Sequence, residues 1–246
     1  STSLSGIVPR WEWRTFGERL VTAERRLAAV APEQVQESDD LYLIARDGCD
    51  TAVKIRDGLV DVKRLVSTSE SGLEQWVPVM KEPFPLPAAS VGLVLSYLHV
   101  GSTALDRPEY ALEELLELVR ASDDVTQVDV SKRRTRYRIG GCMAEVTEAS
   151  TDRGTAWTIA VESEDPARVV ATAADLGLAS LPNVSYPRWL RMLVGYLEAR
   201  FCVIDVGTNS VKFHIGERGT DGSWQTVVDR AELTRLGESL DRTGDL

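Results

Sequence analysis

Charged residues recur at every second position in several segments, with apolar residues between them. Residues two apart share one face of a β-strand, so Arg10, Glu12 and Arg14 fall on one face and Trp11 and Trp13 on the other. The charged members of the later segments are, in chain order, Lys54, Arg56, Asp61, Lys63, Lys132, Arg134, Arg136, Arg138, Glu145, Glu162 and Glu164. A solvated sheet face would show the same alternation, and for any one strand that alternative stays open.

The basic residues are unevenly spread. Nine of the 28 Lys and Arg residues fall within residues 54–64 and 131–138. Like charges stacked on one strand repel each other unless an anion or a carboxylate lies between them. If the strands close into a barrel with helices covering its apolar outside, the charged faces point inward and form a positive channel.

Such a channel suits a linear phosphate chain, because Arg offers paired donors to phosphate oxygens and Lys a compact charge. The predicted phosphate-binding residues are Arg10, Arg14, Lys54, Arg56, Lys63, Lys132, Arg134, Arg136 and Arg138. Hard cations such as Mg²⁺ or Mn²⁺ prefer oxygen ligands and bridge phosphate oxygens. Glu12, Glu145 and Glu162 are therefore the candidate metal ligands and catalytic residues. A metal-activated water could attack a terminal phosphoryl group without a side-chain nucleophile.

Glycines, prolines and apolar periodicity divide the chain into the elements that would position these side chains. Asp47-Gly48 and Asp57-Gly58 predict tight hairpins, and Asp165 with Pro166 predicts a helix start. The expected elements are a strand over 8–16, a helix over 17–30, three short strands up to about residue 66, helical structure over 83–121, strands over 126–139, 142–150 and 156–164, a helix from 166 to 177, a loop over 180–186 and a helix over 187–200.

A second candidate site lies beyond residue 200, where the sequence changes to short apolar segments separated by glycine-rich turns. Asp205 and the run Gly207-Thr208-Asn209-Ser210 lie between two apolar segments that are expected to form strands. Glycine allows close backbone approach, the hydroxyl and amide groups can bind phosphate, and Asp205 can reach a metal-bound water. A generic hairpin is the alternative.

Composition excludes several classes of protein. The formal net charge of −10 argues against general nucleic-acid binding, so no DNA partner is expected. The three cysteines have neither metal-ligand nor redox spacing, and two histidines without paired spacing disfavour a His-based metal site. We find no membrane-spanning run and no signal peptide, and therefore expect a soluble cytoplasmic protein. The first residue is not Met, which suggests a piece of a longer protein.

The order of these features resembles the CYTH, or triphosphate tunnel metalloenzyme, superfamily over about residues 7–180. The matching features are the charged first strand, Val53-Lys54-Ile55-Arg56-Asp57-Gly58, the basic strand from Lys132 to Arg138, and the late Glu-bearing strands. The resemblance implies an antiparallel tunnel barrel that binds or hydrolyses triphosphate, polyphosphate or related nucleotides with a divalent metal. The family's opening Glu-x-Glu-x-Lys stands here as Arg10-x-Glu12-x-Arg14, which replaces a metal-binding carboxylate by a cation. A non-catalytic polyphosphate-binding module is therefore the alternative to hydrolysis.

Residues 201–246 resemble the start of the exopolyphosphatase/guanosine-pentaphosphatase (Ppx/GppA) family, in the Asp205 to Ser210 loop and in Leu233-Thr-Arg235-Leu-Gly237-Glu238. This resemblance implies phosphate and metal binding by Asp205, Thr208, Asn209 and Ser210, with Arg235 and Glu238 nearby. Exopolyphosphatase-type hydrolysis would need a longer chain, which supplies a later Glu and a second phosphate loop. The expected fold is α+β, an antiparallel tunnel-like β-barrel with flanking helices followed by the first strands of a ribonuclease-H-like (actin-like ATPase) domain. The expected domains are 1–185, a helical connection over 186–200, and 201–246.

Overall fold

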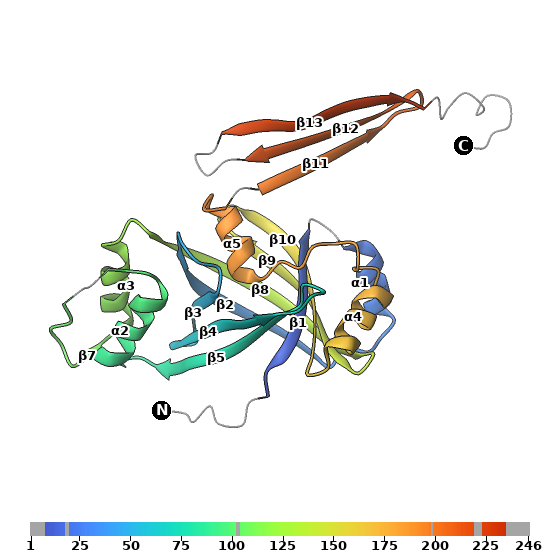
Figure 1. Ribbon diagram of the computed structural model, residues 1–246. Coiled ribbons are helices and arrows are strands. Elements are labelled where there is room, and N and C mark those ends of the chain that lie inside the picture. The colour runs from blue at the N-terminus through green and yellow to red at the C-terminus, as the bar shows by residue number, and fades with distance from the viewer. Residues whose placement is uncertain (1–7, 18–19, 102–103, 198, 219–222, 235–246) are drawn as a thin grey trace. The chain divides into compact units, whose positions relative to one another are not determined.

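Eight strands form a closed antiparallel barrel, which confirms the expected barrel (Figure 1). The computed structural model describes residues 8–17, 20–101, 104–197, 199–218 and 223–234. The barrel strands are β1 (Arg10–Gly17), β2 (Gln34–Ala45), β3 (Thr51–Arg56), β4 (Leu59–Thr68), β5 (Glu74–Pro83), β8 (Val125–Ile139), β9 (Cys142–Thr151) and β10 (Gly154–Ser163). Their order around the barrel is β1-β10-β9-β8-β2-β3-β4-β5, so β1 closes the sheet between β10 and β5.

Two pairs of helices cover the outside of the barrel on separate sides (Figure 1). One pair is α1 (Val21–Ala28) and α4 (Pro166–Asp175), and the other is α2 (Ala88–Tyr97) and α3 (Leu112–Arg120). A two-stranded ribbon of β6 (Leu86–Pro87) and β7 (Glu109–Tyr110) accompanies α2 and α3. A further helix, α5 (Tyr186–Leu193), follows the last barrel strand.

The apolar side chains of the strands face these helices and form two hydrophobic cores. Trp13 lies in the core that includes residues of α1 and α4, and Val53 and Ile55 lie in the core that includes residues of α2 and α3. Burial of each such side chain contributes roughly 1.5–3 kcal/mol. Because the apolar face of each strand is held outward in this way, the alternate charged face points into the barrel.

Both Asp-Gly pairs lie between neighbouring strands, but only Asp57-Gly58 forms the tight hairpin that the sequence predicts, since Asp47-Gly48 lies in a longer connection between Ala45 and Thr51. Gly48 (φ 76°) lies between β2 and β3, and Asp57 (φ 51°) and Gly58 (φ 70°) join β3 to β4. Glycine adopts positive φ without a steric penalty, so these positions fix where each hairpin turns. The predicted cap of α4 is also confirmed, because the Ala167 amide donates to Asp165 Oδ1 at 2.9 Å.

Several expected boundaries were wrong. The strand β5 was not predicted, since Pro78 and Pro83 interrupt its pattern and its pairing with β4 shifts register. The helical region over 83–121 is two separate helices, and the helix expected to begin at residue 17 begins at Val21. The helix expected over 187–200 covers Tyr186–Leu193, and Ala199 already belongs to a strand.

The chain divides into two compact units after Leu190. In the second unit, the described residues include a three-stranded antiparallel sheet of β11 (Ala199–Val206), β12 (Ser210–Arg218) and β13 (Trp224–Leu233), in that order. This sheet does not by itself define a ribonuclease-H-like domain. The predicted site residues Arg235 and Glu238 lie outside the described residues. Within the described part of the chain, none of the helices has the length and apolar character needed to cross a membrane.

Candidate functional site

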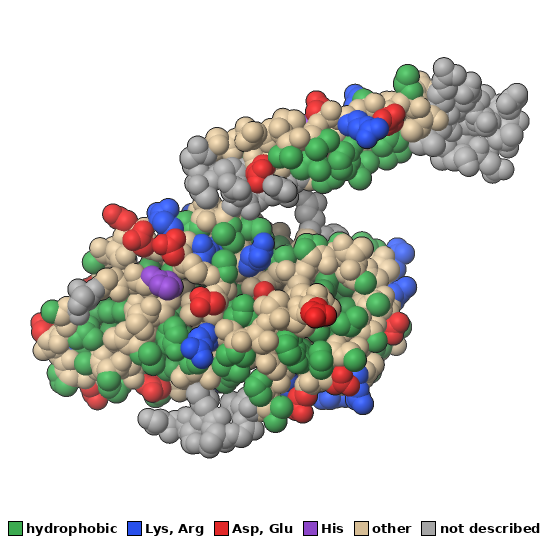
Figure 2. Space-filling model, viewed as in Figure 1, with side chains coloured by type: hydrophobic (Ala, Val, Ile, Leu, Met, Phe, Trp, Pro, Cys, Tyr) green, Lys and Arg blue, Asp and Glu red, His purple; other side chains and the backbone are tan. Residues whose placement is uncertain are grey.

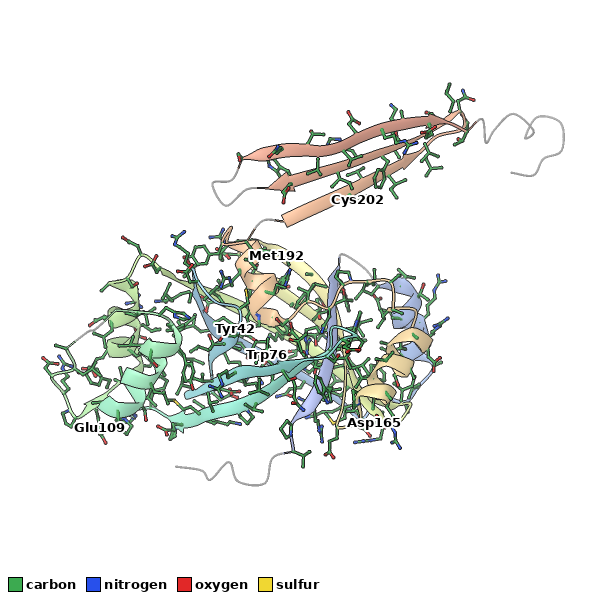
Figure 3. The ribbon with its side chains drawn as sticks, in the orientation of Figure 1. Tyr42, Trp76, Glu109, Asp165, Met192 and Cys202 are labelled. Atoms are coloured by element: carbon green, nitrogen blue, oxygen red, sulfur yellow. The ribbon has the colours of Figure 1, made fainter. Side chains whose placement is uncertain are left out.

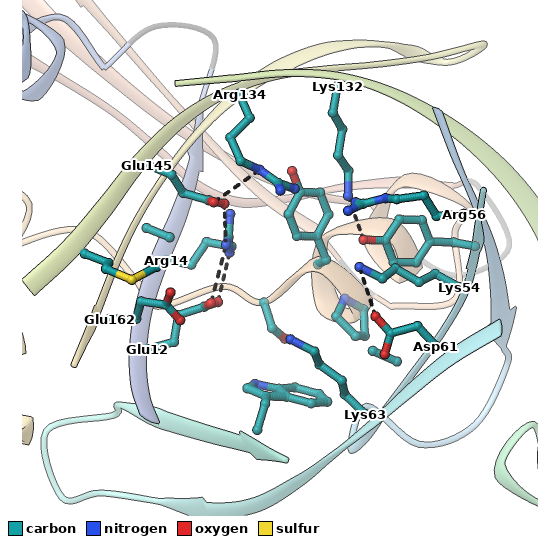
Figure 4. A pocket seen from close by; sticks show the side chains of 18 of the residues that line it. Glu12, Arg14, Lys54, Arg56, Asp61, Lys63, Lys132, Arg134, Glu145 and Glu162 are labelled. Atoms are coloured by element: carbon teal, nitrogen blue, oxygen red, sulfur yellow. Dashed lines mark hydrogen bonds and ion pairs between the residues drawn. The ribbon is translucent and has the colours of Figure 1, made fainter. Parts of the chain in front are cut away.

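A cavity of about 310 Å³ lies inside the barrel (Figure 4). Seven basic side chains line it: Arg14, Lys54, Arg56, Lys63, Lys132, Arg134 and Arg136. Four acidic side chains accompany them: Glu12, Asp61, Glu145 and Glu162. On the face drawn in Figure 2, basic and acidic side chains are intermixed on the outside of the barrel unit. Basic groups outnumber acidic groups in this lining, so the interior is chemically suited to an anion.

Seven of the nine barrel residues predicted to bind phosphate line this cavity, together with all three predicted carboxylates. Arg10 and Arg138 are the two exceptions. The Arg10 side chain is 44% exposed and lies 3.6 Å from Glu162, and Arg138 Nε lies 2.9 Å from Glu33 Oε1 at an exposed position. Both residues are on the predicted face but near the end of their strand, so they lie beyond the enclosed part of the barrel.

One wall of the cavity is an alternating row of arginines and carboxylates on β1, β9 and β8. Arg14 Nε donates to Glu12 Oε1 and its Nη2 to Glu145 Oε1, both at 2.9 Å. Arg134 Nε lies 3.2 Å from Glu145 Oε2 without the alignment of a hydrogen bond. Burial would raise the pKa of Glu145, but Arg14 and Arg134 outweigh it and hold that pKa at about 2. Glu145 is therefore an ionised counter-charge that keeps two arginines in place.

A second cluster is centred on Asp40, whose side chain is completely buried. Arg56 donates to both Asp40 oxygens, and Lys132 Nζ donates to Asp40 Oδ2 at 2.8 Å and to the Tyr42 hydroxyl at 2.7 Å. Burial opposes ionisation of Asp40, but the hydrogen bond from Arg56 and the charge of Lys132 hold its pKa far below the usual range. Asp40 thus anchors two cations that line the cavity.

Lys132 is the most deeply buried of the cavity cations, with a side chain 1% exposed. Burial lowers its pKa to about 7, although Asp40 acts in the opposite direction. Lys54, which lies 3.4 Å from Asp61 Oδ2, also has a lowered pKa, because burial and the neighbouring Arg56 together outweigh the effect of Asp61. Both lysines are less costly to charge when an anion is present.

The carboxylates that could hold a metal lie on adjacent strands. Glu12 is in register with Glu162 on β10 and with Glu74 on β5. Burial raises the pKa of Glu162, and Glu12 and Glu145 raise it further. Burial also raises the pKa of Glu74, and Glu12 adds to this effect although the Trp76 indole donates to Glu74. A cation would relieve this repulsion.

These carboxylates nevertheless do not form a ready metal centre. Searching the described residues finds no group of three or more His, Cys, Asp or Glu side chains placed to hold a metal ion. Glu12 and Glu145 are both bound by Arg14. The residues present therefore do not fit a metal held by the protein alone, and Mg²⁺ or Mn²⁺ would need phosphate oxygens of a ligand to complete its shell.

Aromatic side chains complete the lining, and the sequence did not predict them as site residues. Tyr42, Trp76 and Tyr186 all line the cavity, and Figure 3 shows Tyr42 and Trp76 within the outline of the barrel. The Tyr186 ring stacks on Tyr42 at 5.8 Å between centroids. Asp40 and Glu74 were also missed. Strand parity contained a signal for Asp40, because Asp40 and Tyr42 are two residues apart and share one face of β2. Tyr186 lies outside the barrel strands, at the start of α5, and had no such signal.

The second predicted phosphate site lies in the other unit. Gly207, Thr208 and Asn209 join β11 to β12, and the Gly207 amide donates to the Ser210 carbonyl at 2.9 Å. The Thr234 amide donates to the Asn209 carbonyl at 3.0 Å. Asp205 is exposed and in register with Lys212. The strand–turn–strand arrangement is the expected one. Both a phosphate-binding loop and a generic hairpin would have it, so it does not distinguish between them.

No family model and no curated protein matches the sequence. Among solved structures, the chain is similar to a putative adenylyl cyclase from Hippeastrum described as having a dominant triphosphatase activity, with 15% identity over 69% of this chain and 88% of that chain and a TM-score of 0.38. It is also similar to a putative adenylate cyclase from Bacillus halodurans (12% identity, 71% and 93% covered, TM-score 0.40). A conserved hypothetical protein from Pyrococcus furiosus gives 17% identity, 69% and 91% covered and a TM-score of 0.41. Similarity at this level defines neither a ligand nor an activity, which therefore have to be inferred from the cavity.

Proposed function

We propose that the barrel binds a linear triphosphate or polyphosphate in its cavity. The observation that carries this proposal is the convergence of seven basic side chains on one cavity of about 310 Å³. Four carboxylates in the same lining offset only part of that charge. A phosphate chain offers closely spaced anionic oxygens that match a row of Arg and Lys donors. A CYTH-type tunnel, which the sequence resembles, would have this function.

The direct test is calorimetric titration of the full chain with tripolyphosphate, without metal. We expect one site per chain, and we expect Lys54→Ala combined with Arg56→Ala to weaken binding by about tenfold or more, since each charge-assisted hydrogen bond is worth roughly 1.5–3 kcal/mol. Circular dichroism of the double variant would establish that it is folded. Equal affinity of the folded variant and the unchanged protein would reject the proposal.

A second candidate function is metal-dependent hydrolysis of the bound phosphoanhydride, with Mg²⁺ or Mn²⁺ carried largely by the phosphate chain. The observation that favours it is the row of Glu74, Glu12 and Glu162 on three adjacent strands. The pKa values of Glu74 and Glu162 are raised. Arg10, which stands where the family has a metal-binding carboxylate, favours the binding module instead. Phosphate release from tripolyphosphate with either metal separates the two functions, and no release would leave binding alone.

We also propose that residues 201–246 are the beginning of a Ppx/GppA-type phosphatase domain, in which Asp205, Gly207, Thr208, Asn209 and Ser210 bind phosphate and metal. The sequence of the loop supports this proposal, and the turn closed by Gly207 and Ser210 is compatible with it. The assignment can be tested by measuring polyphosphate affinity for the full chain and for the double variant Asp205→Asn with Asn209→Ala. An unchanged affinity and stoichiometry with polyphosphate and Mg²⁺ would favour the generic hairpin.

A further inference from the structure

The cavity has one open and one closed end, which can be followed along β1. Its inward-facing side chains become steadily less exposed, from 44% for Arg10 through 26% for Glu12 to 7% for Arg14. The next inward-facing residue, Phe16, stacks on Trp189 of α5 with 4.5 Å between ring centroids. The mouth is therefore near Arg10, and the base is beyond Arg14.

Helix α5 and the segment before it are tied to β1 at this base. The Arg14 amide donates to Asn183 Oδ1 at 2.8 Å, and the Val184 amide donates to the Arg14 carbonyl at 2.6 Å. The Asn183 side chain also donates to the Gly72 carbonyl at 2.7 Å. Tyr186 is packed edge-on against Phe16, with 5.1 Å between their ring centroids. These contacts hold a layer of aromatic rings beyond Arg14, from which we infer that a phosphate chain does not pass through this end.

The base is also the most desolvated part of the cavity, and two of the cavity cations lie there. Lys132 Nζ lies 3.9 Å from the centroid of the Tyr186 ring and the Arg14 guanidinium 4.8 Å from it. The side chains of Arg14 and Lys132 are 7% and 1% exposed. The Tyr186 hydroxyl is buried and has no hydrogen-bond partner among the described residues. A buried donor without a partner costs free energy, which an acceptor oxygen of a ligand would recover.

These features distinguish the end of a phosphate chain from its middle. A terminal phosphoryl group has an additional ionisable oxygen and so carries more charge than an internal one. Only a free end can reach a closed base, because an internal segment would have to enter doubled back on itself. We propose that the barrel binds the free terminal phosphoryl group of a linear phosphate chain end-first, with its oxygens against Arg14, Lys132 and the Tyr186 hydroxyl, while the rest of the chain leaves through the mouth near Arg10. This inference rests on the proposed function and adds which part of the polymer is bound.

The stoichiometry of binding tests the inference, since every linear chain has two ends. We would titrate the full chain with two linear polyphosphate samples, one about twice as long as the other, in calorimetry without metal. We expect two protein molecules per polyphosphate chain at both lengths. Binding of protein in proportion to chain length would overturn the inference while leaving polyphosphate binding intact. No binding of either sample, or of tripolyphosphate, would overturn both.

Blocking the ends gives an independent measurement on the same protein. Linear polyphosphate with both terminal phosphates capped as phosphoramidates, and cyclic trimetaphosphate, should bind at least about tenfold more weakly than their uncapped or linear counterparts. Tyr186→Phe keeps the ring and removes the hydroxyl, so it should weaken binding of uncapped chains several-fold and leave capped chains unaffected. Tyr137→Phe, on the outer face of β8, is the matched control. Equal affinity for capped and uncapped chains would contradict the inference.

Discussion

Arg14 and Glu145 form an ion pair across an intervening strand, with 2.9 Å between Arg14 Nη2 and Glu145 Oε1. The strand between them is β10, and Ala160 is in register with both residues. The methyl group of Ala160 leaves room for the guanidinium to reach over it. The pair links β1 to β9 inside the barrel and sets how much positive charge a ligand meets.

Glu145→Gln should therefore have opposite effects on stability and on anion affinity. It leaves two buried arginines with less counter-charge, which should lower the free energy of unfolding by about 3 kcal/mol. It also removes a negative charge next to the proposed ligand, which should tighten tripolyphosphate binding on the order of tenfold in the absence of metal. Chemical denaturation and calorimetry measure the two effects.

Glu148→Gln, three residues further along the same strand and on its other face, is the control for Glu145→Gln. It should change neither the stability nor the affinity appreciably. Weaker tripolyphosphate binding by Glu145→Gln in both metal-free and Mg²⁺ buffers would contradict the counter-charge role. Weaker binding only with Mg²⁺ would instead identify Glu145 as a metal ligand.

Neighbouring arginines on β8 allow a matched comparison of its two faces. Arg134 lines the cavity with a side chain 10% exposed, whereas Arg133 points outward and is 68% exposed. Arg134→Ala should weaken tripolyphosphate binding by roughly tenfold to a hundredfold, through the loss of charge-assisted hydrogen bonds. Arg133→Ala should leave the affinity unchanged in the same titration. An equal loss in both variants would mean that the ligand binds outside the barrel.

Lys132 should make anion binding depend on pH near neutrality. Its pKa is about 7 in the folded chain, because burial disfavours the charge. Above pH 7 a bound anion must restore that charge, so binding should take up a proton and weaken as pH rises from about 7 to 9. Calorimetry in buffers of different ionisation enthalpy measures the uptake. Lys132→Met should reduce this uptake, with Lys54 as the remaining cavity lysine whose pKa is lowered, and unchanged proton uptake in that variant would assign the effect to other groups.

Acid should destabilise the barrel through its buried carboxylates. The pKa of Glu145 is about 2, and that of Asp40 is also held far below its usual range, in both cases against the effect of burial. A lowered pKa stabilises the fold above the unfolded value of about 4 and loses that contribution as pH falls toward the folded value. Denaturant midpoints between pH 6 and pH 2.5 should fall, and less steeply for Glu145→Gln. A flat profile in the unchanged protein would contradict the ion-pair assignment.

Strand parity in the sequence was sufficient to find most of the cavity cations. Lys132, Arg134 and Arg136 alternate with outward residues, and the barrel turns all three inward. Parity gives the face of a strand but not the depth along it, which is why Arg138 was predicted as a ligand and lies exposed near the end of β8.

The remaining parts of the site depend on closure of the barrel more than on a local pattern. Asp40 follows Asp39 in a stretch that resembles a solvated strand, yet it is buried because Arg56 and Lys132 reach it from β3 and β8. Tyr186 comes from a helix after the last strand, and its place in the cavity is set by the contacts of Asn183 and Val184 with β1. Neither long-range contact has a signature in one sequence.

A crystal structure of the full chain with tripolyphosphate, without metal, would test the central claim most directly. We predict density for the ligand inside the barrel, with its oxygens within hydrogen-bond distance of Arg14, Lys54 and Arg134. Density for the ligand on the outer surface, with the cavity side chains still paired only to one another, would contradict the account.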